Sequence, residues 1–346
     1  MKSKNLSEKI LRSIKSKGFK VIELDPVLET KYILQRSGEN FKKFLFSFYD
    51  LNGKELCLRP DLTVSSVLRF IQNKTNKKEK VCYSGEAFRK TYQKKDSIIK
   101  NQIGFEILGS NNHQKDDKSI IDTSLNILRN GPFKKSVLKI GNVELFNLLI
   151  EKLDIPTRWR NRLKRHYWNE SYFNELLKRL ETNSDIDPVF VEIDKSRNLK
   201  MRKDNQNKMV AGRTYKEILD RFNMKINDPR KTPTGKSNSK IIKEFLKIKC
   251  PLEKAPKVLN AFFKKNKINI IVGKGFFPLS KNNNKNLRIE FSAANGREVE
   301  FYSSMIFSIE VKIRSNFRNF ISGGRYDQLT TNLGFKKVSA VGAAVN

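Results

Sequence analysis

The sequence predicts an α+β protein, with an antiparallel sheet flanked by helices and a mainly helical insertion. Strand-like runs joined by turn signals occur near both ends of the chain, and helical or polar segments fill the stretch between them. A chain of 346 residues, 38% of them hydrophobic, can bury one large domain and a smaller one. We therefore expect two domains, one large and one smaller.

The first predicted elements are a helix, a strand and a hairpin. Residues 7–17 place their apolar side chains on one side of an amphipathic helix. Residues 19–25 form a strand-like run that stops before a proline. In residues 44–59 two β-prone runs flank Asn52-Gly53, a dipeptide typical of tight hairpin turns. This is the strongest hairpin signal in the chain.

A second group of elements follows as far as residue 143. Residues 61–73 have apolar side chains at helical spacing. The stretch AFRKTYQKKDSIIKNQIGFEILG, residues 87–109, has two apolar runs around a lysine-rich middle, as expected for a loop between paired strands. Residues 116–130 have the spacing of a further helix, and residues 136–143 have the composition of a strand.

The remaining chain is helical first and strand-like at the end. Helical spacing recurs in three segments, at 143–153, 156–167 and 170–181. Residues 227–239, NDPRKTPTGKSNS, are polar and rich in turn formers, which indicates a disordered or linker segment. Residues 241–265 are helical again, and residues 286–329 form a strand meander containing a glycine pair.

The net charge of +34 does not by itself indicate a nucleic-acid-binding protein. Nucleic-acid binders concentrate basic residues on one face, whereas lysine here is spread along the whole chain together with abundant asparagine. We interpret the charge as compositional bias and do not expect nucleic acid to be bound. A polyanionic small substrate or an acidic partner protein remains compatible with it.

Cysteine and histidine usage argues against a metal site. Cys57, Cys82 and Cys250 are widely spaced and contain no CxxC pair, so they indicate neither a zinc site nor a disulfide framework. Only two histidines occur, at His113 and His166. No run of about 18 apolar residues and no secretory signal is present. We expect a cytoplasmic protein without a membrane segment, metal or cofactor.

Polar residues on otherwise apolar predicted strands indicate a binding pocket. Gln102 and Glu106 project to the same side of one strand, where an unpaired carboxylate would be costly to bury. Arg59, Asp61 and Thr63 alternate at the end of the predicted hairpin. Taken singly, each is more often a structural ion pair than a site residue. Further polar residues lie near or on other predicted strands: Arg297, Glu300, Tyr302 and the segment Gly323 to Tyr326. Together they favour a pocket across one face of the sheet.

Four segments resemble, in order, the motifs of histidyl-tRNA synthetases. They are LRPDLT at 58–63, the AFRK and QIGFE ends of the hairpin at 87–106, REVEFYSSMIF at 297–307 and ISGGRYDQL at 321–329. The run around Pro26 resembles motif 1, the dimer-forming segment of class II aminoacyl-tRNA synthetases. The resemblance implies a class II synthetase-like fold, with a core domain formed by residues 1–154 and 281–346 and an insertion domain at residues 155–280. It also implies a homodimer as the building block.

Two departures from these motifs argue against synthetase activity. Thr91 stands where the family has a glutamate that helps to hold ATP, and the basic loop that follows has become YQKKDSII. The sequence stops at VSAVGAAVN, where the family continues into motif 3 and an anticodon-binding domain. Losing charges placed for the phosphates would cost several kcal/mol in the transition state. We therefore expect no catalysis and no catalytic residue.

Two further segments, 141–163 and 209–222, resemble the regulatory subunits of ATP phosphoribosyltransferase, relatives of the synthetase. That resemblance implies a non-catalytic subunit of histidine biosynthesis. Its partner would be the short-form catalytic subunit, which makes phosphoribosyl-ATP from ATP and phosphoribosyl pyrophosphate. The hetero-oligomer would carry histidine feedback.

The resemblance to the synthetase also implies a pocket for L-histidine. The residues carried over are Asp61, Thr63 and Gln102 near the ammonium group, Glu106 and Tyr302 facing the imidazole with Tyr326 beside them, and Arg89 and Arg297 near the carboxylate and phosphate. A carboxylate that faces the imidazole can accept its N–H. Glu300, Phe301 and Ser304 depart from the family pattern. Two alternatives stay open: a synthetase-like enzyme that activates histidine or modifies another acceptor, and a tRNA-binding module with a localised basic face.

Overall fold

The computed structural model describes residues 2–73, 77–91, 97–182, 192–193, 196, 214–226, 228, 232–278, 286–297 and 301–345. The chain divides into two compact units. The core unit comprises Met1–Leu145, Lys249–Leu259 and Val272–Asn346, and the helical unit comprises Phe146–Ile248 and Asn260–Ile271. The expected boundaries at 154–155 and 280–281 differ from these, and Lys249–Leu259 of the core unit lies within the expected insertion. The expected domains stay a prediction about folding units.

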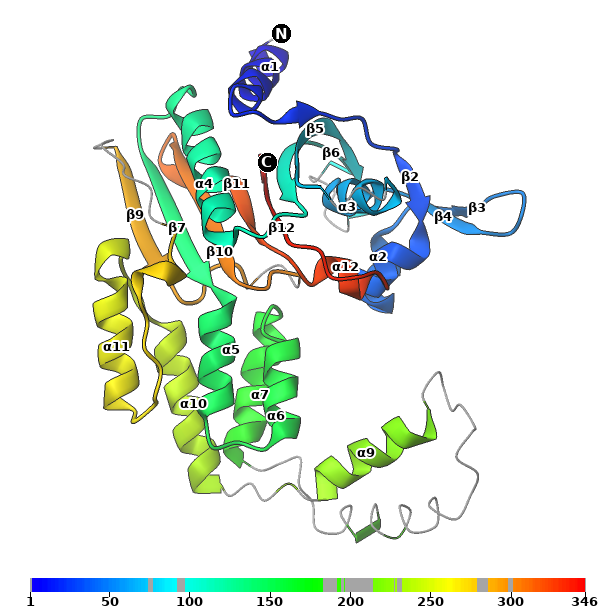
Figure 1. The fold of residues 1–346 in the computed structure, drawn as a ribbon. Helices are drawn as coiled ribbons and strands as arrows, with labels where there is room; N and C mark the ends of the chain where they lie inside the picture. Colours follow the sequence, from blue (N-terminus) through cyan, green and yellow to red (C-terminus); the bar gives the residue numbers. More distant parts are fainter. Residues whose placement is uncertain are drawn as a thin grey trace. The chain divides into compact units, whose positions relative to one another are not determined.

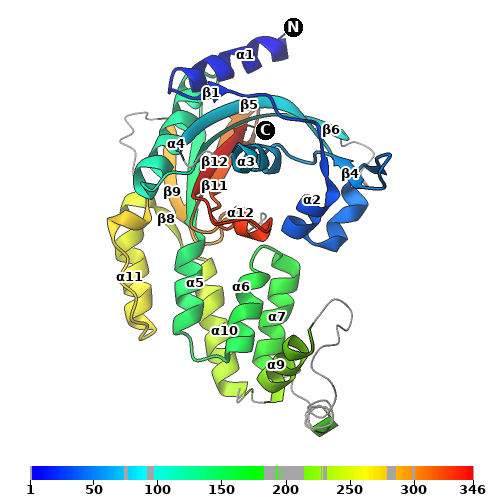
Figure 2. The same ribbon diagram turned by 45° about the vertical axis from the view of Figure 1, so that its right-hand side comes forward.

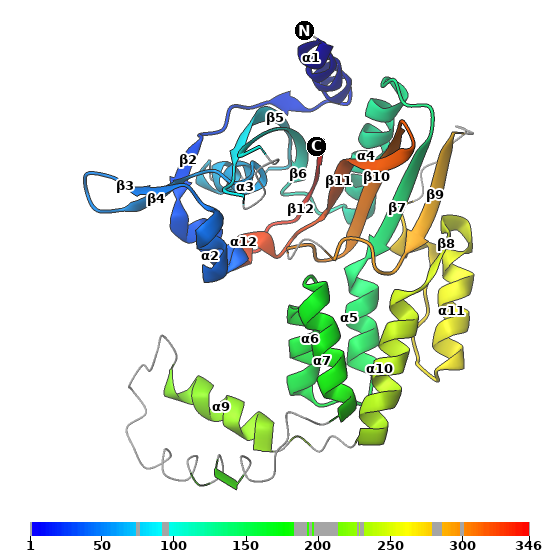
Figure 3. The ribbon, with the colours of Figure 1, turned by 180° about the vertical axis from the view of Figure 1, so that it is seen from behind.

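A large mixed sheet forms the centre of the core unit (Figures 1 and 3). Over the described residues its strand order is β1-β5-β6-β12-β11-β10-β7-β9-β8. In that order the strands are β1 Lys20–Val21, β5 Glu79–Phe88, β6 Ile99–Leu108, β12 Ala340–Val345, β11 Asn316–Arg325, β10 Met305–Ile313, β7 Ser136–Asn142, β9 Leu287–Ser292 and β8 Lys249–Pro251. Every pair from β5 to β7 is antiparallel, whereas β1 with β5 and β7 with β9 are parallel. The expected antiparallel sheet is confirmed in its centre and is wrong at these two pairs.

Helices cover both faces of this sheet. Helices α1 (Lys2–Lys15) and α4 (His113–Arg129) lie on one face, and α3 (Thr63–Gln72) lies on the other, inside the curve of β5 and β6 (Figure 2). The side chain of Asn112 caps α4 by accepting the N–H of Lys115. These helices have the predicted amphipathic spacing. Each therefore presents one apolar stripe, which it buries against the sheet.

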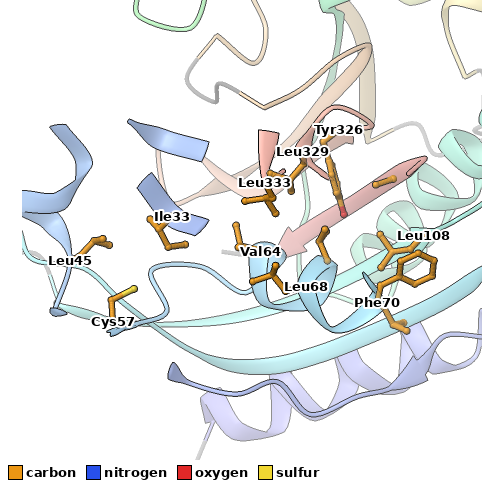
Figure 4. Packing of buried hydrophobic residues seen from close by; sticks show 13 residues of the cluster. Ile33, Leu45, Cys57, Val64, Leu68, Phe70, Leu108, Tyr326, Leu329 and Leu333 are labelled. Atoms are coloured by element: carbon orange, nitrogen blue, oxygen red, sulfur yellow. The ribbon is translucent and has the colours of Figure 1, made fainter. Parts of the chain in front are cut away.

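The apolar side of α3 forms the main hydrophobic cluster on its face (Figure 4). Val64 and Leu68 contact residues from β6, from α2 (Thr30–Ser37) and from the short helix α12 (Leu329–Asn332). Leu108, Tyr326 and Leu333 are among these neighbours, and all are less than one-tenth exposed. The cluster therefore fixes α3 and the segment after β11 against each other.

The hairpin around Asn52-Gly53 is confirmed. Strands β3 (Ser47–Tyr49) and β4 (Glu55–Leu58) pair antiparallel, and β2 (Val27–Glu29) adds a third strand. Gly53 has a φ of +75°, which favours glycine, and the carboxylate of Asp50 accepts the N–H groups of Asn52 and Lys54. A 3₁₀ helix, η1 (Glu39–Phe44), precedes the hairpin.

The helical unit contains most of the helical residues between β7 and β9. Its helices are α5 Val143–Lys152, α6 Thr157–Arg165, α7 Glu170–Thr182, α9 Tyr215–Ile226, α10 Thr232–Leu246 and α11 Ala255–Lys265, the first and last of which begin in the core unit. Phe146 and Tyr167 stack with their ring centroids 4.0 Å apart, and Trp159 donates its indole N–H to Asp228 at 3.1 Å. None of the described helices combines the length and hydrophobicity needed to cross a bilayer.

Two expectations in this region are wrong over the described residues. Residues 232–239 of the linker expected at 227–239 form the first half of α10, whereas residues 227 and 229–231 lie outside the described residues. Gly235 lies so close to the carbonyl of Leu180 that a Cβ atom would clash, which lets α10 approach α7 closely. The polar residue Ser239 donates to Glu181 at 2.6 Å and thereby joins the two helices. The expected helix 241–265 is interrupted by β8 and a 3₁₀ turn, Leu252–Lys254.

Candidate functional site

One row of paired residues crosses the centre of the sheet on the face that α3 covers. Glu106 on β6 pairs with Val81 on β5 and with Gly342 on β12. Gly342 pairs with Gly324 on β11, which pairs with Ile306 on β10. Directly paired residues project to the same face of a sheet. The row therefore places a carboxylate beside two residues that have no side chain.

The two glycines of this row make room for two tyrosines. A Cβ atom on Gly342 would lie 2.7 Å from Cγ of Glu106 and 2.9 Å from the hydroxyl of Tyr326. A Cβ atom on Gly324 would lie 2.8 Å from the ring of Tyr302. Neither glycine has a positive φ, so the requirement is close approach rather than backbone freedom. The glycines thus form the floor on which Glu106 and both rings rest.

Glu106 is the buried carboxylate of this group. It is 1% exposed, and the hydroxyl of Tyr83 donates to its Oε1 at 2.7 Å. Burial raises the pKa of Glu106 to about 7, although the nearby hydroxyls of Ser66, Tyr83 and Tyr326 oppose the rise. Oε2 makes no well-oriented hydrogen bond with any described residue, and neither does the hydroxyl of Tyr326. These atoms could be satisfied by the N–H of a ligand.

The three tyrosines around Glu106 remain neutral phenols. Burial raises the pKa of Tyr83, Tyr302 and Tyr326, and the negative charge of Glu106 raises each of them further. A neutral phenol can both donate and accept a hydrogen bond. The carboxylate and the phenols together can therefore recognise a small ring that carries N–H groups.

A second charged group surrounds Asp61, at the start of α3. Its Oδ2 forms an ion pair with Arg36 of α2, and its Oδ1 accepts the N–H of Val64 at 3.1 Å. Burial tends to raise the pKa of Asp61, but the charges of Arg36 and Arg89 outweigh burial and lower it. Asp61 is therefore an ionised carboxylate between two guanidinium groups.

Arg89 lies just after β5 and turns back toward this group. Its Nε donates to the carbonyl of Pro60 at 2.7 Å, and its backbone N–H donates to the carbonyl of Ile98. Burial lowers the pKa of Arg89, and the charge of Asp61 opposes that shift. Arg59, by contrast, is used structurally, because its guanidinium donates to the carbonyls of Leu24 and Glu86.

The other predicted pocket residues lie around the same face. Thr63 is the first residue of α3, and its hydroxyl opposes the rise that burial causes in the pKa of Tyr83. Gln102 is on the Glu106 side of β6 and is half-buried. Arg297 is 8% exposed and lies in the turn after β9. The preceding Gly296 lies against the side chain of Ile306, which puts this turn on the same face. Glu300 lies outside the described residues. The assignment of these residues to a histidine pocket stays a prediction.

The sequence did not indicate Arg36, Tyr83 or Ser66 as site residues. Arg36 lies near the end of an amphipathic helix, and Tyr83 has the composition expected of any strand. Val81, Tyr83 and Gly85 are two residues apart and so share one face of β5, the face of Glu106, which pairs with Val81. Only this spacing could have indicated that Tyr83 belongs to the site.

A cavity of about 690 Å³ lies on the opposite face of the sheet and is separate from this site. Asp117, Asn142 and Met305 line it, and Met305 projects away from the face of its neighbour Ile306. None of the predicted pocket residues lines this cavity. The large cavity and the predicted pocket are therefore different places.

Comparison with known proteins finds similarity to histidyl-tRNA synthetases and to a group of their relatives. The family model of histidyl-tRNA synthetase matches residues 1–224. Curated relatives named ATP phosphoribosyltransferase regulatory subunit include one from Sinorhizobium fredii, 25% identical over 93% of this chain and 90% of that protein. Another, from Agrobacterium fabrum, is 26% identical over 92% of this chain and 88% of that protein.

Solved structures share the fold at lower sequence identity. An ATP phosphoribosyltransferase regulatory subunit/histidyl-tRNA synthetase from Bacillus halodurans is similar, with a TM-score of 0.57 and 18% identity, over 99% of this chain and 76% of that chain. A histidine–tRNA ligase subunit from Alicyclobacillus acidocaldarius is similar, with a TM-score of 0.55 and 17% identity, over 99% of this chain and 89% of that chain. Because the histidyl-tRNA synthetase model matches more than half of the sequence, the chain belongs to the histidyl-tRNA synthetase family.

Proposed function

We propose that this protein is a non-catalytic regulatory subunit of ATP phosphoribosyltransferase, required for the first step of L-histidine biosynthesis. The observation that carries the proposal is the set of curated relatives with that name, which align with more than nine-tenths of the chain. The synthetase-like fold is compatible with it, because one fold can support different functions.

The proposed lack of catalysis is supported by Thr91. A threonine hydroxyl carries no charge, so it cannot replace the glutamate that the resemblance places at this position for ATP. We expect no histidine-dependent exchange of pyrophosphate into ATP above background. A related synthetase assayed in parallel provides the positive control. Exchange well above background would support the second candidate, an enzyme that activates histidine, which the Glu106 and tyrosine group also favours.

The proposed partner is the short-form catalytic subunit, with a homodimer of this chain as the building block and L-histidine as the ligand of the Glu106 site. The short form should be nearly inactive alone and should gain activity when this protein is added. Size-exclusion chromatography with light scattering should then detect a larger complex. Full activity of the isolated catalytic subunit, with no complex at micromolar concentration, would contradict the proposal and favour the tRNA-binding alternative.

A further inference from the structure

The acceptor expected for a ligand ammonium group is already occupied within this chain. Both oxygens of Asp61 have partners, because Oδ2 pairs with the guanidinium of Arg36 and Oδ1 accepts the N–H of Val64. The side chains of Arg36 and Asp61 are 8% and 10% exposed. A buried pair with this geometry neutralises the carboxylate, so an added ammonium would find little net negative charge there.

The guanidinium of Arg36 is held in this position from several sides. Its Nε donates to the hydroxyl of Ser37 at 2.9 Å. Its centre lies 5.4 Å from the ring of Phe301 and 6.0 Å from the ring of Phe41, within the range of cation–π contact. A ligand ammonium would have to compete with a guanidinium that is hydrogen-bonded and lies over two aromatic rings. We therefore treat Arg36 as a fixed part of the site.

The Asp61 group consequently has a net positive charge. Arg36 pairs with Asp61, and Arg89 donates to the carbonyl of Pro60, the residue before Asp61, so two positive charges lie near one carboxylate. One carboxylate cannot compensate two guanidinium groups, so one positive charge remains at this end. An anionic group of a ligand would restore the balance and accept hydrogen bonds from the guanidinium groups.

The Glu106 end of the site offers a hydrogen-bond acceptor instead of a positive charge. Oε2 of Glu106 makes no well-oriented hydrogen bond with a described residue, and the hydroxyl of Tyr326 lies close to this carboxylate. Tyr83 connects the two ends, because its hydroxyl donates to Glu106 while its side chain belongs to one buried cluster with Leu62, the residue after Asp61. The site therefore offers an acceptor at one end and a cation at the other.

We propose that this site selects small acids that carry an N–H-bearing ring, such as imidazole carboxylates, and that an α-ammonium group adds little to their binding. Arg36 is then the residue that sets this specificity. The inference rests on the proposed ligand pocket and goes beyond it, because a pocket built for histidine alone would use the ammonium strongly.

Three ligands test the proposal on the full-length protein by calorimetry. L-Histidine has ring, carboxylate and ammonium, imidazolepropionate lacks the ammonium, and histamine lacks the carboxylate. We expect imidazolepropionate to bind within about threefold of histidine, and histamine to bind at least about tenfold more weakly. Imidazolepropionate that binds tenfold more weakly than histidine, or histamine that binds as tightly as histidine, would overturn the proposal.

The variant Arg36→Met tests the role of the guanidinium. It frees the carboxylate of Asp61, so the affinity for histidine relative to imidazolepropionate should rise about tenfold. Arg69→Met is the matched control, because Arg69 pairs with Glu79 in a more exposed ion pair of the same unit. In Arg69→Met the affinity for histidine relative to imidazolepropionate should not change. If Arg36→Met does not fold, the three-ligand series on the unmodified protein still decides.

Failure of this inference can be distinguished from failure of the proposed function. If none of the three ligands binds, the specificity inference is overturned. Association with the catalytic subunit is measured separately by mixing, and its success would leave the regulatory role standing with its ligand site elsewhere.

Discussion

At the scale of single residues, Glu106 has a proton affinity that depends on folding. Its carboxylate is 1% exposed, and burial raises its pKa from 4.5 to about 7. The folded protein therefore holds a proton that the unfolded chain has already released between these two pH values. The resulting stabilisation is fully present below about pH 4.5 and is lost as the pH rises to about 7.

The variant Glu106→Gln should remove this pH dependence. A neutral amide needs no proton, so its advantage in free energy of unfolding over the unmodified protein should grow from pH 4.5 to pH 8, by on the order of 3 kcal/mol. Urea unfolding at several pH values measures the difference. The control is Glu151→Gln, because a hydrogen bond from Lys164 lowers the pKa of the exposed Glu151. An advantage that does not grow with pH would show that Glu106 is already ionised in the folded protein.

Which site residues the sequence could indicate depends on whether the signal is local. Glu106 and Gln102 stand out because polar residues alternate within an apolar strand, and the motifs add Asp61 and Tyr302. Arg36 is 25 residues from Asp61 in the chain, and nothing in its own helix marks it. Such a partner becomes visible only when the helix and the start of α3 are brought together.

At the scale of elements, a buried arginine joins α4 to the end of β11. Arg325 is 2% exposed and donates to Asp117 of α4 at 2.9 Å and to Asp327 at 3.0 Å. It also donates to the hydroxyl of Ser339 and to the carbonyl of His113. Every one of these groups is left without that donor when the guanidinium is removed.

The variant Arg325→Met should therefore destabilise the core unit by about 3–5 kcal/mol, because two buried carboxylates lose their counter-charge. Chemical denaturation followed by circular dichroism measures the loss. Arg288→Met is a suitable control, since Arg288 is 66% exposed in its ion pair with Glu290 and should cost less than about 1 kcal/mol. Equal losses in both variants would refute the structural role of Arg325.

Element prediction succeeded where the chain carries its own signal and failed where packing decides. The hairpin at Asn52-Gly53 could be predicted because this dipeptide favours tight hairpin turns, and Gly53 has the positive φ that such a turn requires. The start of α10 contains Gly235 and polar residues, which locally favour a loop. Its helix is stabilised by contacts with α7 that no local pattern reveals, among them the hydrogen bond from Ser239 to Glu181.

At the scale of the whole molecule, the sheet holds the Glu106 group apart from Thr91. The floor of paired glycines and Glu106 is built from β6, β11 and β12 in the centre of the sheet. Thr91 lies after β5 and outside that floor. A change there can remove a group expected to contact nucleotide without disturbing the sheet. The proposed loss of catalysis at Thr91 is therefore compatible with an intact floor around Glu106.

If the retained pocket carries histidine feedback, it must be coupled to the proposed catalytic partner. Coupling between two binding sites is reciprocal, so histidine must change the affinity for the catalytic subunit by the same factor as that subunit changes the affinity for histidine. We expect a factor of about 5 to 150, as is usual for allosteric proteins. Calorimetry of histidine with and without saturating catalytic subunit gives one factor. Titration of the subunit with and without saturating histidine gives the other.

The variant Glu106→Ala should shift histidine feedback to at least about tenfold higher histidine concentrations and leave the association intact. It removes the buried acceptor for the ligand ring, so histidine should bind at least about tenfold more weakly. Assembly with the catalytic subunit, measured by light scattering, should be unchanged because Glu106 is buried inside the core unit. Two outcomes would relocate the feedback site to the catalytic subunit or to the interface: undiminished feedback in this variant, or a coupling factor of one in the unmodified protein.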